Sequence, residues 1–407
     1  MADTRSQDAT RCLVRLFGVA FLFWFGLSLL LPTLPLYLST ELGFSDGSVG
    51  WVIGAFAAGL LLFRPWVGQL ADQRSRVLVI RIGLLAAATA PLGYLVVHTI
   101  PLLIILRIYH GLSIAAFTTG YLALVTDLTP TAGRGRILGY MTMAQPVGVA
   151  LGPALGGYVA EWWGYTPLFL LAAGLGMAAL LWCLMGIPMR PAAHPSQGRA
   201  ALWTLLLAPR LRIPALVLLL VGLVFGTLQI FIPLLIQREG IPMNPGLFYT
   251  AVALSSLLAR FVVGRGLDRL GRGRFITLSL GCYLVAMLTL QTADRVSEFL
   301  AAGLVEGLGS GILIPAMAAL IADRSYPRER GRTFGLCLGG FDLGIALAGP
   351  VMGAVASGLS IRGLFSITAS LAALALAVFV TQGGKTLADS LRFALTNNRD
   401  AYQVQES

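Results

Sequence analysis

Charge is scarce in this 407-residue chain, because only 12% of its residues are Asp, Glu, Lys or Arg. Soluble domains usually carry about 25% charged residues, which help to cover a surface exposed to water. Lysine is nearly absent, since Lys385 is the only one, and the three histidines are widely separated. This composition argues against an ordinary soluble protein, and histidines so scattered predict no zinc site.

Cysteine is also infrequent. The chain has four, Cys12, Cys183, Cys282 and Cys337, which are far apart and have neither metal-ligand spacing nor the pattern of a disulfide framework. The stretch Gly383-Gly384-Lys385-Thr386 is similar to part of a phosphate-binding loop, but Phe379 replaces the first glycine and no strand precedes it. No nucleophile is accompanied by a base or a metal-ligand set. We therefore expect no enzyme, no cofactor and no metal centre.

Apolar residues, in contrast, make up 57% of the chain and fall in long runs. About 20 such residues cross a bilayer as a helix, and a helix satisfies its own backbone polar groups in lipid. We identify twelve blocks of this kind: 14–39, 47–70, 77–98, 101–127, 136–161, 166–187, 212–237, 245–267, 274–293, 297–323, 331–357 and 361–381. The sequence predicts an all-α membrane protein with twelve transmembrane helices.

Basic residues outnumber acidic ones, with 29 Lys and Arg against 18 Asp and Glu. If the N-terminus is cytoplasmic, nearly all loop arginines lie on the cytoplasmic side, and the opposite side holds Arg238, Arg295 and Arg362. This asymmetry follows the positive-inside rule. It predicts a multi-pass protein of a bacterial-type inner (plasma) membrane with both termini cytoplasmic. The positive charge therefore indicates orientation in a lipid bilayer, and we expect no nucleic-acid partner.

An internal repeat relates the two halves of the chain at an offset of 196 residues. The matched pairs include Arg64/Arg260, Gly68/Gly264, Asp72/Asp268, Arg76/Arg272, Gly111/Gly307 and Asp127/Asp323. Six helices per half keep both copies in the same orientation, and transporters built this way bind substrate between the halves near the midplane. We predict six-helix halves at 1–188 and 212–384, a cytoplasmic linker at 189–211 and a cytoplasmic tail at 385–407.

Three motifs resemble the major facilitator superfamily across nearly the whole chain. Residues 68–76 (GQLADQRSR) and 264–272 (GRGLDRLGR) are similar to the family's G-x-L-A-D-R-x-G-R loop, with Gln73 and Ser75 departing from it. Residues 107–111 (RIYHG) are similar to R-x-x-Q-G, with His110 in place of glutamine. The resemblance implies a fold of two parallel-repeat six-helix bundles and a transport function.

A fourth motif narrows that expectation. Residues 148–157 (GVALGPALGG) match the G-x-x-x-G-P-x-x-G-G motif of proton-coupled exporters, so the chain is most like the twelve-helix drug or metabolite:proton antiporters. Within it, Gly148, Gly152 and Gly156 form a stripe that lets another helix approach closely, while Pro153 bends the helix and Gly157 ends the motif.

Ionisable residues within the apolar blocks are functional candidates, because a charge in hydrocarbon costs at least a few kcal/mol. Asp342, Glu306 and His110 are our candidates for proton coupling. Arg107, which lies one turn before His110, can steer an anionic substrate or hold a carboxylate ionised. With His110, Asp342, Gln145 and Gln229 it forms the predicted substrate cavity. The alternatives remain open: Asp342 and His110 as hydrogen-bonding packing residues, and Glu306 facing a wet vestibule.

The loop after the second helix predicts a gate on the cytoplasmic side. Asp72 is placed to accept from free N–H groups at the start of a neighbouring helix, and the resemblance implies the helix beginning near Gly331. Arg76 lies one turn further and can pair with Asp127. Gly68 completes this first copy, and Gly264, Asp268 and Arg272 form the second.

The function predicted from these features is secondary active transport by alternating access. We expect proton-coupled efflux of a small amphipathic drug or metabolite, with the proton as coupling ion and a functional monomer. The alternative is uptake or uniport of a sugar or organic acid on the same fold. A channel is not expected, because a pore ring needs several subunits and this chain is a duplicated monomer.

Overall fold

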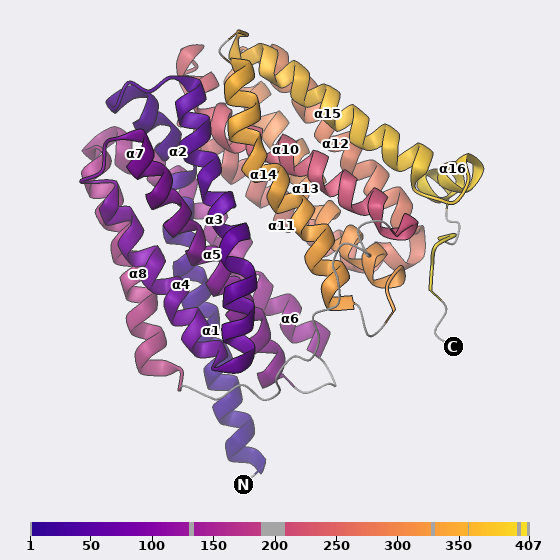
Figure 1. Ribbon diagram of the computed structural model, residues 1–407, viewed down its shortest axis with the longest axis horizontal. Helices are drawn as coiled ribbons and strands as arrows, with labels where there is room; N and C mark the ends of the chain where they lie inside the picture. Colours follow the sequence, from indigo (N-terminus) through magenta and orange to yellow (C-terminus); the bar gives the residue numbers. More distant parts are fainter. Residues whose placement is uncertain are drawn as a thin grey trace. The chain divides into compact units, whose positions relative to one another are not determined.

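The computed structural model describes residues 2–129, 134–188, 208–326, 330–356, 358–396 and 400–404; the side chains of 2–9, 134–136, 261–270 and 330–332 lie outside that description. Every regular element in these ranges is a helix (Figure 1). The chain divides into two compact units, one of Met1–Gly198 with Asn244–Thr250 and the other of Arg199–Met243 with Ala251–Ser407. The predicted all-α fold is confirmed.

The first unit holds the helices of the N-terminal part of the chain. They are α1 (Ala2–Ser28), α2 (Leu30–Leu36), the π-helical turn η1 (Tyr37–Glu41), α3 (Asp46–Gln73), α4 (Arg76–Gly93), α5 (Ile100–Leu128), α6 (Arg134–Thr142), α7 (Ala144–Trp163) and α8 (Tyr165–Gly186). Pro32 and Pro35 each remove a backbone donor, which explains the short α2 and the π turn after it.

The second unit holds the remaining helices. They are α10 (Pro209–Arg238), α11 (Gly246–Leu270, whose first turn belongs to the first unit), α12 (Arg272–Thr292), α13 (Val296–Asp323), α14 (Arg330–Ala356), α15 (Ile361–Gln382) and α16 (Leu387–Leu395). Short polar caps begin some of them. The Ser360 hydroxyl, for example, accepts from the backbone N–H of Gly363 at 3.2 Å at the start of α15.

Ten helices in the described ranges are long and apolar enough to cross a membrane, and they coincide with ten of the twelve predicted blocks. The block 136–161 differs, because Met143 separates α6 from α7 and Pro146 cannot donate a helical hydrogen bond in the first turn of α7. The block 245–267 corresponds to α11, whose described apolar stretch is Gly246–Arg260. Twelve crossings therefore remain a prediction.

The same helix pairings recur in both units. In the first unit α1 packs on α7, and α4 packs on both α5 and α8. In the second unit α10 packs on α14, and α12 packs on both α13 and α15. These are the helices that the 196-residue offset matches in sequence, so the repeat extends from residue identities to packing.

In both units arginine side chains, at positions that the offset does not match, satisfy the C-terminal end of a helix. In the first unit, Arg15 Nη1 donates to the carbonyl of Gly186 at 2.9 Å, and Arg81 Nη2 donates to that of Ile187 at 3.0 Å. In the second unit, Arg324 Nη2 donates to the carbonyl of Gly383 at 2.6 Å. Since these are unpaired carbonyls at the C-terminal ends of α8 and α15, arginine provides both hydrogen bonds and a favourable charge.

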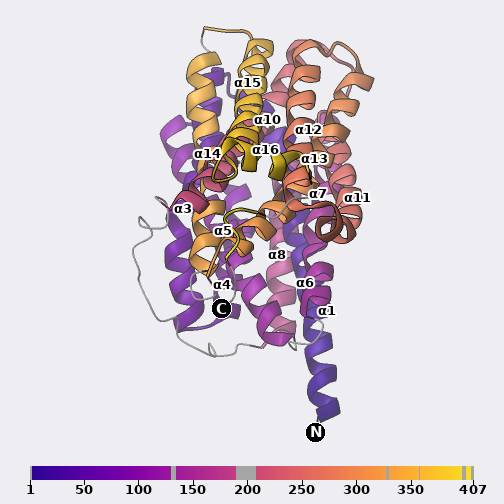
Figure 2. The same ribbon diagram turned by 90° about the vertical axis from the view of Figure 1, so that its right-hand side faces the viewer.

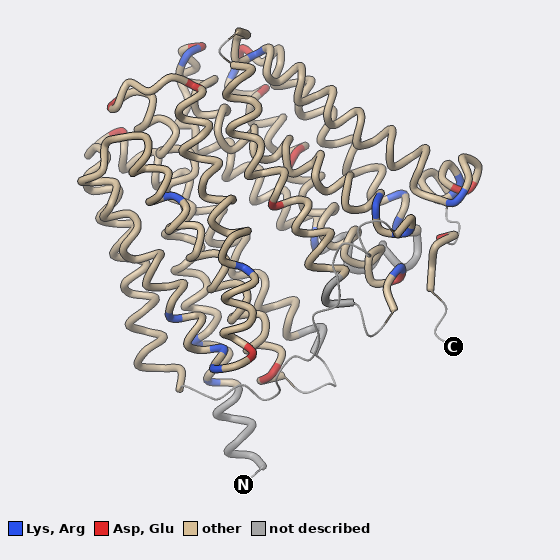
Figure 3. Tube along the Cα trace, viewed as in Figure 1, with Lys and Arg blue, Asp and Glu red and all other residues tan. Residues whose placement is uncertain are grey.

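Basic residues gather at one end of the first unit, the end from which α1 emerges, and few lie along its helices (Figure 3). This distribution agrees with the asymmetry seen in the sequence.

An ion cluster lies at the opposite end of the second unit from Arg324. Arg362 Nη2 donates to Glu239 Oε2 at 2.8 Å, to Asp294 Oδ1 at 2.5 Å and to the carbonyl of Ala293 at 3.2 Å. Hydrogen bonding from Arg362 holds the pKa of Glu239 below its ordinary value of 4.5. The cluster thus ties the end of α10 to the loop after α12 and to the first turn of α15.

The predicted tail 385–407 is more than a loose extension where it is described. It forms α16, which packs on α12 and α15 of its own unit (Figures 1 and 2).

Candidate functional site

Arg107 lies on α5 and is only 8% exposed. Its Nη2 donates to the carbonyl of Ile53 at 3.3 Å, its Nη1 donates to the Tyr94 hydroxyl at 3.4 Å, and its guanidinium carbon lies 4.4 Å from the centroid of the Phe56 ring. Among the described residues of the first unit no carboxylate forms a salt bridge with it. Dipoles and an aromatic face therefore stabilise this buried charge.

His110 lies one turn further along α5 and is 1% exposed. Its Nδ1 is 3.0 Å from the Tyr94 hydroxyl, so Tyr94 connects His110 to Arg107. Because Arg107 can only donate, the Tyr94 oxygen accepts from it, and the Tyr94 hydrogen is free for Nδ1. This arrangement favours the neutral imidazole that carries its proton on Nε2.

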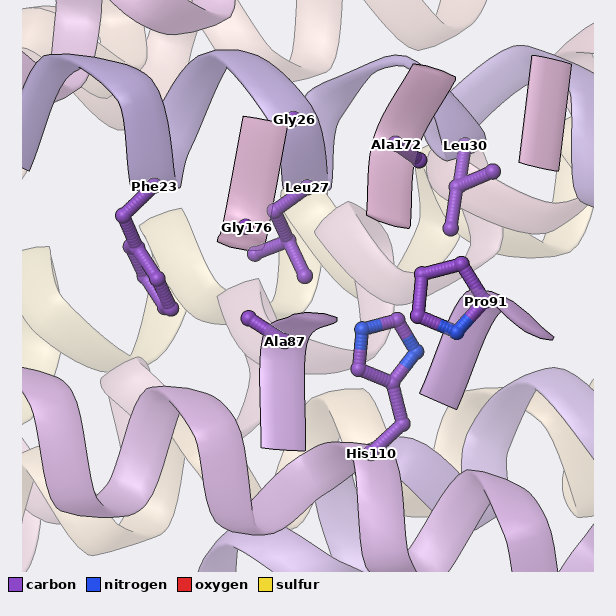
Figure 4. Close-up of a pocket in the computed structure, with 9 residues that line it drawn as sticks. All are labelled: Phe23, Gly26, Leu27, Leu30, Ala87, Pro91, His110, Ala172 and Gly176. Carbon is purple, nitrogen blue, oxygen red and sulfur yellow. The ribbon is translucent and has the colours of Figure 1, made fainter. Parts of the chain in front are cut away.

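The His110 ring projects into a small apolar pocket between α1, α4 and α8, where Pro91, Ala87 and Leu27 surround it (Figure 4). The Phe56 ring stands nearly perpendicular to it, with centroids 5.3 Å apart. Both interpretations of His110, as a proton-coupling residue and as a hydrogen-bonding packing residue, stay predictions.

Glu306 lies on α13 of the second unit at the position equivalent to His110, since the offset between them is 196. It is 1% exposed. The Tyr283 hydroxyl of α12 lies against its carboxylate, but among the described residues neither carboxylate oxygen has a hydrogen-bond partner of normal geometry. A buried carboxylate with so little compensation is costly when ionised.

The glycines that follow these two residues pack alike. A Cβ on Gly111 would strike the backbone of α3 at Phe56, and a Cβ on Gly307 would strike the backbone of α11 at Val252. Phe56 and Val252 are themselves 196 residues apart. The repeat therefore places two titratable side chains at equivalent positions, one in each unit.

In the first unit Arg76 pairs with two carboxylates, and a gating role for this group stays a prediction. Arg76, at the start of α4, forms a salt bridge with Asp72 at the end of α3, and its Nε lies 3.6 Å from Asp127 Oδ2 at the end of α5. One arginine therefore joins the ends of three helices.

The second unit repeats part of the arrangement. Arg272 forms a salt bridge with Asp323 and donates to the carbonyl of Ala319 at 2.8 Å. The contacts of Gly264 and of the Asp268 side chain lie outside the described part of the chain, so the rest of the second copy stays a prediction.

Asp72→Asn is expected to lower the transport rate roughly tenfold, equivalent to about 1.4 kcal/mol, because Arg76 then loses its closest anion. The measurement is substrate transport by cells that hold equal amounts of the protein in the membrane. Asp46→Asn, at the other end of the same helix, is the matched control. Equal rates for both variants and the wild type would contradict a gating role.

The glycine stripe of α7 faces α1. A Cβ on Gly148 would lie 2.9 Å from the backbone nitrogen of Phe25, and a Cβ on Gly152 would strike the Ser28 hydroxyl. A Cβ on Gly156 would strike the backbone of Leu29. The close helix approach predicted from the spacing is therefore present, with α1 as the partner.

Gly152→Val is expected to destabilise the protein by about 1–3 kcal/mol, the usual cost of overpacking. Thermal unfolding of the purified protein checks this. Gly174→Val on α8 is the control, because a Cβ there meets nothing within 4 Å. A Gly152→Val protein as stable as this control would show that α1 and α7 need no close contact.

The segment Asn244–Thr250, which includes the first turn of α11, belongs to the first unit and contacts α7. Asn244 Nδ2 donates to the carbonyl of Ala154 at 3.3 Å, and Thr250 Oγ1 donates to that of Ala150 at 2.8 Å. Gly157 faces the Asn244 side chain.

The remaining predicted site residues are less buried than Arg107, His110 and Glu306. In the first unit, Gln145 is exposed near the start of α7, and a Cβ on Gly68 would have no neighbour within 4 Å. In the second unit, Gln229 and Asp342 are half-buried, and both have interaction partners. Their membership of one substrate cavity with Arg107 and His110 remains a prediction.

Two tyrosines were missed by sequence reasoning. Tyr94 bridges Arg107 and His110 from the end of α4, and Tyr283 contacts Glu306 from α12. Each reaches its partner from a different helix, so no spacing pattern along the chain could have indicated it.

Comparison with known proteins agrees with this architecture. The sequence model of the Major Facilitator Superfamily matches residues 16–294 and 246–392. Quinolone resistance protein NorA of Staphylococcus aureus is 32% identical over 161 residues, which are 40% of this chain and 41% of that protein. Multidrug resistance protein 1 of Bacillus subtilis (strain 168) is 33% identical over 161 residues, 40% of this chain and 41% of that protein. The match covers less than half of either relative.

A solved structure shows the same fold over more of the chain. The nucleoside transporter NupG has a TM-score of 0.78 at 15% identity, over 91% of this chain and 99% of that one. Identity this low supports the fold alone. Because the family model matches most of the chain and the helical architecture agrees, the protein belongs to the Major Facilitator Superfamily and is a multi-pass membrane protein.

Proposed function

We propose that this transporter exports small amphipathic compounds in exchange for protons, by alternating access between two six-helix halves. The observation that carries the proposal is its identity of 32% and 33% with two proteins named for drug resistance. The proposal includes twelve membrane crossings, with α7 and α11 as the two beyond the ten apolar spans, and cytoplasmic termini.

The packing of α7 supports export. Its exporter-type motif is in close contact with α1 through Gly148, Gly152 and Gly156, and Pro153 lies within the same helix. A helix packed this tightly leaves little room for protons to leak beside it.

The proton site that we propose is Glu306. Its carboxylate is buried and has no hydrogen bond of normal geometry to the residues that the structure describes, so a bound proton removes the cost of a buried anion. Release requires water or an added charge to reach the carboxylate, which a change of conformation supplies. A single proton entering through 100 mV provides about 2.3 kcal/mol for this exchange.

The direct test uses purified protein in liposomes with an imposed pH gradient. We expect fluorescent amphipathic cations and quinolones to move against their gradients and to carry protons in the opposite direction. A panel of sugars and organic acids is measured in parallel. Movement of a sugar or an organic acid with protons, and no movement of the amphipathic compounds, would replace export by uptake on the same fold.

A further inference from the structure

The helix α16 is folded onto the second unit by one of its faces. Ser390, Phe393 and Ala394 are buried on that face. Thr277 Oγ1 of α12 donates to the carbonyl of Ala394 at 3.0 Å, and Arg274 Nε donates to the carbonyl of Leu395 at 3.0 Å. Contacts at its C-terminal end therefore define the orientation of this nine-residue helix.

The chain after α16 is anchored as well. Arg324 is 0% exposed, and its guanidinium forms two hydrogen bonds with the carboxylate of Asp400. Nε donates to Oδ2 at 2.6 Å, and Nη2 donates to Oδ1 at 2.9 Å. Its guanidinium carbon lies 5.0 Å from the centroid of the Tyr402 ring. The backbone N–H of Val404 donates to the carbonyl of Asp323 at 2.9 Å. With both of its ends held, α16 presents one defined outer surface.

That outer surface carries a stripe of three leucines. Leu387, Leu391 and Leu395 are 58%, 39% and 56% exposed. Their spacing of four residues puts them on one side of the helix, next to the protein-facing side. The stripe is an apolar surface that begins five residues after the last residue of the membrane-spanning helix α15, Gln382.

Basic side chains accompany the leucines. Lys385, just before the helix, and Arg392, at the far edge of the leucine stripe, are both exposed, and so is Arg274 beside the C-terminal end. The carboxylate of Asp389 accepts from the Thr386 hydroxyl at 2.8 Å at the start of the helix. The outer surface of α16 is therefore apolar along the leucine stripe, next to the protein, and positively charged at Arg392 and Lys385.

We propose that α16 is a binding surface for acidic phospholipids of the adjacent leaflet. The leucines lie among the acyl chains, and Lys385 and Arg392 contact the negative headgroups. A helix with an apolar side bordered by basic residues is suited to lie parallel to the membrane, at the boundary between headgroups and acyl chains. Each basic residue near an anionic surface contributes about 1 kcal/mol, or roughly fivefold in affinity. The inference holds whatever substrate the transporter carries.

Depth measurement tests the leucine side. A nitroxide is attached at Leu391→Cys or at Thr396→Cys, in protein whose four native cysteines are replaced by serine, after reconstitution in phosphatidylcholine and phosphatidylglycerol vesicles. At position 391 we expect high oxygen accessibility and low accessibility to a water-soluble nickel complex, and the reverse at 396. Equal nickel accessibility at both positions would overturn the proposal. Concentration-dependent spin coupling at 391 would overturn it in favour of a second copy of the chain.

Lipid dependence tests the basic side. Addition of phosphatidylglycerol to phosphatidylcholine nanodiscs is expected to raise the thermal unfolding temperature of the wild type. The double variant Lys385→Gln/Arg392→Gln should lose most of that rise and keep the unfolding temperature in phosphatidylcholine alone. Arg238→Gln, at the other end of the unit, is the control and should keep the rise. An unchanged rise in the double variant would show that these residues bind no acidic lipid.

Discussion

Glu306→Gln is expected to abolish transport driven by a pH gradient while leaving substrate exchange across the membrane intact. Glutamine has nearly the shape of a protonated glutamic acid but cannot release a proton, so the variant retains the neutral form of the site. One pH unit supplies about 1.4 kcal/mol per proton, enough for a roughly tenfold substrate gradient. The wild type should build such a gradient and the variant none.

The measurement compares two assays on the same proteoliposomes. Net accumulation under an imposed pH gradient reports coupling, and exchange of labelled for unlabelled substrate without a gradient reports the conformational cycle. Glu161→Gln, an exposed residue near the end of α7, is the matched control and should behave as the wild type. If Glu306→Gln still accumulates substrate, the coupling carboxylate lies elsewhere, and Asp342 is the next candidate.

Asp400→Asn is expected to destabilise the protein by about 3–5 kcal/mol, because it leaves the Arg324 guanidinium buried without its counter-ion. The Arg324 and Asp400 side chains are 1% and 5% exposed, so solvent provides little compensation. Arg324 also donates to the carbonyls of Gly383 and Arg210, which prevents it from turning toward water without losing two further hydrogen bonds.

A double-mutant cycle measures the pair itself. Arg324→Met and Asp400→Leu are each expected to lower the thermal unfolding temperature, and the combined variant should recover part of the loss because no unpaired charge remains. Strictly additive losses would show that the two side chains contribute independently and that the tail is not anchored by this contact.

The helices were predictable from sequence because their cause is local. A run of apolar residues long enough for the bilayer must be helical, and residues such as Gly164 and Gly271, which have positive φ, separate the runs. The pairing of Arg76 with Asp127 was predicted from the place of Arg76 one turn after Asp72, and the salt bridge of Arg272 with Asp323 lies at the positions that the 196-residue offset makes equivalent.

The buried polar contacts were not predictable in the same way. Tyr94, Tyr283 and Asp400 each reach a partner on another helix, and the rotation of a helix about its axis is set by packing that a nearly uniform apolar sequence does not reveal. Periodicity could place Glu306 and His110 at depth but could not tell which was hydrogen-bonded. The interruption between α6 and α7 at Met143 was not predicted, because the mean hydropathy of a long block does not respond to a single residue such as Pro146.

The ion cluster around Arg362 affects stability in acidic surroundings. In the proposed orientation this cluster faces the outside, where protons accumulate. A carboxylate whose pKa is depressed contributes stability above its unfolded pKa and loses it only as pH falls through the lower, folded value. Since the pKa of Glu239 is held below 4.5, its bond to Arg362 stays intact in mildly acidic medium. The outer end of α10 therefore remains attached to α15 under the conditions in which the proton gradient is steepest.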